Sequence, residues 1–315
     1  MSFTILVAGA TGNTGRSVVE TLSKLRDTST TGTISGYRIL ALTRSLESPA
    51  AKQLATLPHV QVLEKNWVDI TAEWLREHEV VRAFIASHNL PTQFVEESGF
   101  QVAALKAGVE YVVRISTATT NVRPDCEAYY PRAHWAIEAM LSSPEFKNLQ
   151  WTSLQPNGFS TMILYNAAEY IKKYRKTAKQ ETLSLIVSAE APVAIIDPYD
   201  IGVLAAHLLL QKDTSVHNHG RYVVNGPEDI TGEQIVKLVE GRIGAKVDSV
   251  LYKDMSFVEH IPEYRGQTAV LFSLKKGVET LWDGVCTAST TSKEVLELAK
   301  PTRTPTDVLE ALLQD

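Results

Sequence analysis

The sequence has few of the residues on which metal-binding or disulfide-rich domains depend. Only two cysteines, Cys126 and Cys286, occur among 315 residues. They are far apart, which excludes a disulfide framework and the spacing of a zinc site. The eight histidines are not paired at metal-ligand spacing either. We therefore expect no metal centre.

Long apolar runs and an excess of positive charge are also absent. No run reaches about 18 apolar residues, so we expect no membrane-spanning helix. The formal net charge is −5 at pH 7, and we expect no direct contact with nucleic acid. The most basic segment, residues 172–179, is interpreted as a solvated helix end. Because an apolar strand begins almost at the first residue, we expect no signal peptide and a cytoplasmic location.

Apolar segments of strand length alternate with segments of helical periodicity along most of the chain. Hydrophobic residues make up 44% of the sequence and charged residues 21%, which is typical of a globular protein. This alternation predicts a doubly wound, mostly parallel sheet with right-handed crossovers. A long polar loop is expected over residues 27–36. The predicted strands are 4–8, 37–43, 60–63, 80–86, 111–115, 151–154 and 221–224.

The first strand leads into three glycines with the spacing G-x-x-G-x-x-G, and a helical pattern follows at once. At such a turn glycine allows the chain to reverse and its backbone to approach a phosphate, while the helix N-terminus attracts the anion. The alternative is a glycine-rich turn that only connects strand to helix. The residues predicted to bind a dinucleotide here are Gly9, Thr11, Gly12, Asn13, Thr14 and Gly15.

The second strand ends at Arg44-Ser45, and no carboxylate follows until Glu47. In dinucleotide-binding folds an acidic residue at this place accepts a hydrogen bond from the ribose of NAD, whereas an arginine pairs with the 2′-phosphate of NADP. We therefore predict NADP as the cofactor. The alternative is that Arg44 is only a solvated charge at the end of a strand.

Ligands of parallel α/β sheets bind at the carboxyl ends of the strands. Asn66 and Trp67 are expected beside the adenine, and the segment Pro156–Phe159 is expected to cover the nicotinamide. Phe159 can equally be read as core packing. The further residues predicted along this edge are Ser87, His88, Ser116 and Asn157.

Several segments resemble the NmrA-like family of atypical short-chain dehydrogenases. The resemblance implies a Rossmann fold that binds NADP, in a two-lobed monomer or homodimer. Some members of the family reduce small molecules. Others bind NADP(H) without evident turnover and regulate a protein partner such as a transcription factor. The matching segments are Gly9–Gly15, Arg44, Ile137–Glu138, Leu154–Phe159, Ile196–Gly202, Asn225–Glu228 and Thr231–Glu233.

The resemblance divides the chain into two parts. Residues 1–158 form the NADP-binding domain, to which residues 194–225 return, and 159–193 with 226–315 form a smaller α+β lobe for a substrate or partner. Between residues 160 and 190 we expect a helix and then a short strand. Asp200 is predicted to cap a helix that begins at Ile201.

The catalytic motif of short-chain dehydrogenases, Tyr-x-x-x-Lys with an upstream serine, is matched only in part. Ser116 and Tyr130 correspond to the serine and the tyrosine, but His134 stands in the place of the lysine. Pro131 suggests that Tyr130 lies before the helix rather than on it. His134 is expected to touch the nicotinamide ribose or a substrate. The alternative is a surface histidine with a structural partner.

Two further positions depart from the family pattern. Gln155 replaces the arginine of an Arg-Pro-Asn motif, and Met162 replaces the asparagine of many quinone-reducing members. The complete glycine turn, Arg44 and a C-terminal lobe able to form a pocket favour an NADPH-dependent reductase of a small aromatic or unsaturated molecule. An acceptor that needs little protonation would suit a site without the Tyr–Lys pair. The missing lysine and arginine favour the alternative, a non-catalytic NADP(H)-sensing regulator that binds a protein.

Overall fold

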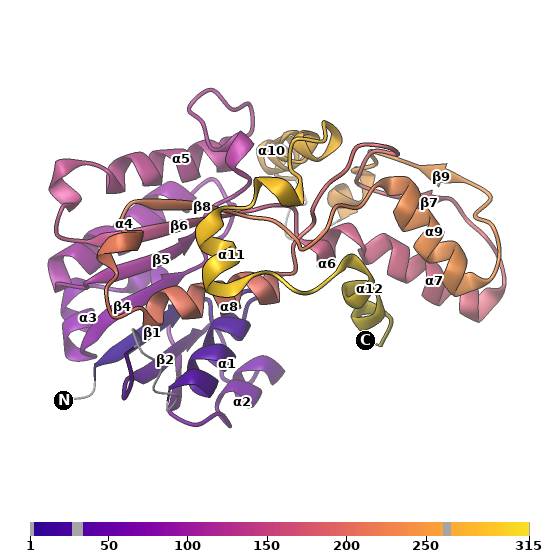
Figure 1. The fold of residues 1–315 in the computed structure, drawn as a ribbon. Helices are drawn as coiled ribbons and strands as arrows, with labels where there is room; N and C mark the ends of the chain where they lie inside the picture. The colour runs from indigo at the N-terminus through magenta and orange to yellow at the C-terminus, as the bar shows by residue number, and fades with distance from the viewer. Residues whose placement is uncertain (1–2, 27–33, 261–265, 315) are drawn as a thin grey trace.

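The computed structural model describes residues 3–26, 34–260 and 266–314. Seven parallel strands form one sheet in the order β3-β2-β1-β4-β5-β6-β8, and β7 pairs with β9 in a second, two-stranded sheet (Figure 1). This order confirms the predicted doubly wound Rossmann sheet. Most of the loop expected over residues 27–36 lies outside the described residues.

The strands follow the predicted apolar segments closely. β6 is longer than expected, because Gln155 and Pro156 also pair with Val223 and Val224 of β8. The strands are β1 Thr4–Ala8, β2 Arg38–Thr43, β3 Val60–Glu64, β4 Val80–Ile85, β5 Tyr111–Ile115, β6 Gln150–Pro156, β7 Leu183–Ser184, β8 Gly220–Val224 and β9 Val250–Leu251.

Helices cover both faces of the large sheet. α1, α8 and α11 lie on one face and α3, α4 and α5 on the other (Figure 1). No helix within the described ranges is long and apolar enough to cross a membrane. The helices are α1 Gly15–Leu25, α2 Pro49–Leu54, α3 Ala72–Glu77, α4 Gln93–Ala107, α5 Tyr129–Leu141, α6 Ser160–Ile163, α7 Tyr165–Thr177, α8 Pro198–Leu210, α9 Gly232–Ile243, α10 Thr268–Gly277, α11 Lys293–Ala299 and α12 Pro305–Gln314.

Two predicted helix starts are wrong. α5 begins at Tyr129, so Tyr130 lies on the helix; Pro131 is tolerated there because the first-turn N–H groups of a helix have no intrahelical partner. The N-cap of α8 is Asp197, whose carboxylate accepts from the Tyr199 N–H at 2.8 Å. Asp200 lies in the first turn of that helix and binds a different segment.

Apolar side chains gather in separate cores. Two of them lie on the faces of the large sheet, and the third is enclosed by α6, α7, α9, α12 and the small sheet. The chain passes several times between the large sheet and the region around the small sheet. After α10, which follows most of the elements around the small sheet, α11 returns to the large sheet, where Val295 is fully buried in the same core as α8.

Candidate functional site

The turn after β1 has a backbone that requires glycine at two positions. Gly9 has φ of +80°, in the left-handed region that residues with side chains rarely adopt. A Cβ on Gly15 would lie 2.1 Å from the carbonyl oxygen of Gly9. Substitution at either position would therefore displace the turn from the start of α1.

The N-terminus of α1 has no side-chain cap. Thr14 occupies the N-cap position but its hydroxyl makes no capping hydrogen bond. Gly12 and Asn13 are exposed beside it, and the Thr11 hydroxyl lies 3.5 Å from that of Thr43. The first N–H groups of a helix carry partial positive charge. Among the described residues no side chain caps the first turn of α1, which leaves this end available to an anion.

Arg44 lies directly after β2 and is exposed, as is Ser45. Within the described residues, the Arg44 guanidinium forms no hydrogen bond or ion pair. The next carboxylate, Glu47, forms an ion pair with Lys52 at 2.7 Å instead. An arginine without a competing carboxylate is available to a phosphate group.

The predicted residues after β3 and β4 lie near one another. Asn66 uses its side-chain oxygen to cap a short 3₁₀ turn, Trp67–Asp69, through the Val68 N–H. The ring centroids of Trp67 and His88 are 6.1 Å apart. His88 also contacts the carboxylate of Glu96 on α4. The two segments therefore form one wall at the carboxyl edge of the sheet.

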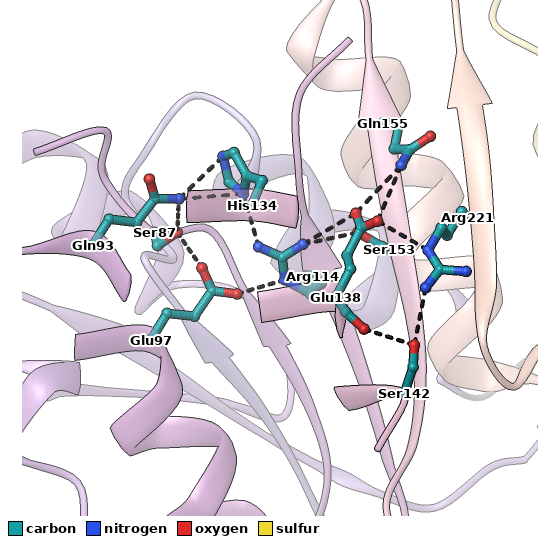
Figure 2. Close-up of polar contacts among 10 residues, drawn as sticks. All are labelled: Ser87, Gln93, Glu97, Arg114, His134, Glu138, Ser142, Ser153, Gln155 and Arg221. Atoms are coloured by element: carbon teal, nitrogen blue, oxygen red, sulfur yellow. Dashed lines mark hydrogen bonds and ion pairs between the residues drawn. The ribbon is translucent and has the colours of Figure 1, made fainter. Parts of the chain in front are cut away.

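A buried polar network lies under this edge, centred on Arg114 of β5 (Figure 2). The Arg114 side chain has no exposed surface, and its Nε donates to the Glu97 carboxylate at 2.5 Å. Its Nη1 donates to the Ser153 hydroxyl at 2.9 Å and to a carboxylate oxygen of Glu138 at 3.5 Å. The sequence pattern places Arg114 inside a strand and does not indicate these partners.

His134 belongs to this network rather than to the molecular surface. Arg114 Nη2 lies 2.8 Å from His134 Nδ1, and because a guanidinium only donates, Nδ1 accepts and the proton resides on Nε2. Only 2% of His134 is exposed. Burial and the adjacent cation hold the pKa of His134 well below its ordinary value. The residue in the lysine position is therefore neutral and has a structural partner.

Ser87 and Gln93 extend the network toward β4. The Ser87 hydroxyl donates to Glu97 at 2.6 Å and accepts from Gln93 Nε2 at 3.2 Å. Gln93 Nε2 also lies 3.1 Å from His134 Nε2, but with the proton on Nε2 both atoms are donors, so this contact is not a hydrogen bond in the present orientation of the amide. Ser87 thus connects the carboxyl end of β4 to the buried charges.

At the other end of the network, Glu138 is 2% exposed and accepts from several donors. Gln155, at the place of the missing family arginine, donates to it at 3.3 Å, and Arg221 of β8 forms an ion pair with it at 3.0 Å. Two arginines, Arg114 and Arg221, therefore balance the two carboxylates, Glu97 and Glu138.

The tyrosine and the serine that correspond to the short-chain dehydrogenase motif are largely enclosed by the protein. A Cβ on Gly277 of α10 would be 2.3 Å from the Tyr130 hydroxyl, so this hydroxyl packs against α10. Burial raises the pKa of Tyr130, and a hydrogen bond with Thr117 acts in the opposite direction. Ser116 is 5% exposed, and its hydroxyl has no hydrogen-bond partner among the residues that the structure describes.

The segment after β6 holds several loops together. Asn157 Nδ2 donates to the carbonyls of Ala194 and Cys286, each at 2.9 Å. Pro156 ends β6, and Phe159 packs on the core of the large sheet. All the predicted cofactor residues apart from His134 follow strand ends at one edge. No cluster suited to a metal ion occurs among the described residues.

The fold is shared with several solved structures. A quinone oxidoreductase from Escherichia coli, complexed with NADPH, is 20% identical with a TM-score of 0.68, covering 98% of this chain and 99% of that one. A Citrobacter triphenylmethane reductase, complexed with NADP(H), is 18% identical with a TM-score of 0.70, covering 99% and 100%. The negative transcriptional regulator Nmra is 13% identical with a TM-score of 0.70, covering 100% and 95%.

No curated protein matches the sequence. A family model does match, and it spans the two-stranded sheet as well as the large one, from residue 1 to residue 303. This chain therefore belongs to the NmrA-like family.

Proposed function

We propose that this protein binds NADP(H) and reduces a small aromatic or unsaturated molecule. The observation that carries the proposal is the combination of the glycine turn, the uncapped N-terminus of α1 and the unpaired Arg44. In this assignment the turn residues hold the pyrophosphate and Arg44 holds the 2′-phosphate. NADPH supplies the hydride, and the chain positions the acceptor and excludes water.

The buried state of His134 supports an acceptor that needs little protonation. A neutral, buried imidazole does not supply the cation that lowers the pKa of the tyrosine in a Tyr-x-x-x-Lys pair. Tyr130, whose pKa is raised, is a poor proton donor. Electron-poor substrates such as quinones, enones and iminium ions accept hydride without a strong acid.

The cofactor part of the proposal is tested with Arg44→Glu. The substitution removes a charge-assisted contact to the 2′-phosphate, which typically contributes about 1.5–3 kcal/mol. We expect NADPH affinity, measured by calorimetry, to fall roughly 10- to 100-fold while NADH affinity is kept or improved. Arg123→Glu, an exposed arginine paired with Asp125 at 2.9 Å, is the control. Unchanged coenzyme preference would show that Arg44 does not read the phosphate.

Turnover is tested anaerobically with NADPH and a panel of quinones, enones and imines. Cofactor oxidation above the rate without protein is the expected result. If the protein binds NADPH with saturation but oxidises none of it, the reductase assignment fails while the cofactor assignment stands.

The second proposed function is an NADP(H)-sensing regulator, which the lack of a Tyr–Lys pair favours. Such a regulator must bind its protein partner differently in the two redox states, because a ligand without differential affinity shifts no equilibrium. Calorimetry measures the affinity of this protein for a candidate transcription factor, once in saturating NADP and once in saturating NADPH. Equal affinities would exclude this role.

A further inference from the structure

A hollow of about 540 Å³ lies beside α5. Its lining residues come from α5, β6, β8 and the turn after β5, and none of them belongs to the predicted coenzyme site. The lining residues are Thr119, Val122, Trp135, Glu138, Ala139, Ser142, Gln155, Arg221 and Val223.

Arg221 is the charge that this hollow presents to solvent. Its side chain is 44% exposed, whereas that of Glu138 is 3% exposed. The guanidinium is fixed by Nε to Glu138 at 3.0 Å and by Nη2 to the Ser142 hydroxyl at 2.9 Å. Within the described part of the chain Nη1 has no partner. An arginine held in one orientation with a free donor is prepared to bind a carboxylate.

Glu138 is buried and its charge is shared by Arg114 and Arg221, so its carboxylate does not face an anion in the hollow. Figure 2 shows its carboxylate between Arg114 and Arg221, with Ser153 and Gln155 also donating to it. An arriving anion therefore meets Arg221 first.

The remaining wall is aromatic and amphipathic. Trp135 on α5 is 39% exposed and lines the same hollow, so its ring offers a stacking surface there. The Gln155 amide nitrogen binds Glu138, and its oxygen is turned away from that carboxylate (Figure 2). The volume lies within the range of small-molecule sites, about 300–1,000 Å³.

We propose that this hollow is a second ligand site, which binds a small aromatic carboxylate. The carboxylate pairs with Arg221 and the ring packs on Trp135. None of its lining residues is among those predicted to bind the coenzyme, so we expect the hollow to be filled with or without NADP(H).

The test is calorimetric titration of the full-length protein with benzoate, without coenzyme. We expect saturable binding of one benzoate per chain, at least tenfold weaker binding of the neutral isostere benzamide, and weaker binding of cyclohexanecarboxylate. Arg221→Gln and Trp135→Ala should each weaken benzoate binding at least tenfold. Arg38→Gln is the matched control, since Arg38 is also half-exposed and paired with a carboxylate, that of Glu79 at 2.7 Å. Trp135 is outside the ion-pair network, so Trp135→Ala remains a valid test if Arg221→Gln does not fold.

Three outcomes overturn the proposal. The first is no saturable benzoate binding, and the second is equal affinity in wild type and Trp135→Ala. The third is displacement of benzoate by saturating NADPH, which would place it at the coenzyme edge. The titrations use no turnover, so the proposed reductase activity can fail without affecting them.

Discussion

At the scale of single residues, His134 occupies the lysine position of the catalytic motif but is a buried, neutral partner of Arg114. A lysine at this position would place its ammonium beside the buried Arg114 guanidinium, 2.8 Å from the present Nδ1. Glu97 and Glu138 are already engaged by arginines. We expect His134→Lys to destabilise the fold by about 3–5 kcal/mol, the usual cost of an uncompensated buried charge. Urea unfolding at pH 7 measures this.

His134→Gln is the control for that substitution. Its amide oxygen can still accept from Arg114, so the loss should be no more than about 1 kcal/mol, a typical hydrogen-bond contribution. If His134→Lys unfolds at the same urea concentration as wild type, the lysine position is not closed to a cation.

The pH dependence of stability provides a second prediction for His134. Its pKa is lowered in the folded state, so below about pH 6.5 the unfolded chain binds a proton that the native protein does not. The free energy of unfolding must then decrease as pH falls, by up to about 1.4 kcal/mol per pH unit from this residue.

Urea titrations of wild type and His134→Gln between pH 7.5 and 5 isolate this contribution. The pKa values of His207 and His217 are also lowered by burial, and these residues contribute equally to both proteins. We expect a flatter profile for the glutamine variant. Parallel profiles would mean that the His134 pKa is not depressed.

At the scale of elements, the coenzyme turn depends on the fit of α8 against α1. A Cβ on Gly202 of α8 would lie 1.9 Å from the Ser17 hydroxyl and 2.5 Å from the Thr14 carbonyl oxygen. We expect Gly202→Ala to cost about 1–3 kcal/mol through overpacking. Because Thr14 must shift, NADPH affinity measured by calorimetry should fall as well.

Gly241 provides the matched control for that substitution. It lies inside α9, and a Cβ there would meet no atom within 4 Å. Gly241→Ala should therefore stabilise the protein by about 0.5–1 kcal/mol through helix propensity. A Gly202→Ala protein as stable as wild type would show that α8 can move away from α1 at little cost.

The strands of the large sheet were predictable because buried parallel strands read as continuous apolar runs. The capping box of α9 is a short-range feature of the same predictable kind, since Thr231 and Gln234 have the required spacing. Arg114 is different, because its partners lie 17 and 24 positions away on other elements. Its one signal is a charge inside an apolar strand, which indicates a buried pair but not the residues that form it.

At the scale of the whole molecule, Asp200 ties the C-terminal segment to the large sheet. Its carboxylate accepts from the Thr302 and Arg303 N–H groups, each at 2.9 Å. Arg303 also pairs with Asp197 at 3.1 Å. These contacts fix the connection between α11 and α12. They therefore also fix the place at which α12 enters the core around the small sheet.

We expect Asp200→Ala to release this connection, because two backbone donors lose their acceptor at a cost of about 1–3 kcal/mol. Hydrogen exchange at Thr302 and Arg303 should accelerate at least tenfold, as measured by mass spectrometry of peptides from this segment. Asp213→Ala, which removes an acceptor from the Ser215 N–H in an exposed loop, should leave these amides unchanged. Equal protection of residues 302 and 303 in both variants would contradict the role of Asp200.

The late return of α11 to the large sheet has a consequence for how the protein is made. The core under α8 includes Val295, so it is incomplete until residue 295 has left the ribosome. Cotranslational folding of the amino-terminal half must therefore pause with apolar surface uncovered, and a nascent chain stalled before residue 295 should need chaperone protection that the released protein does not.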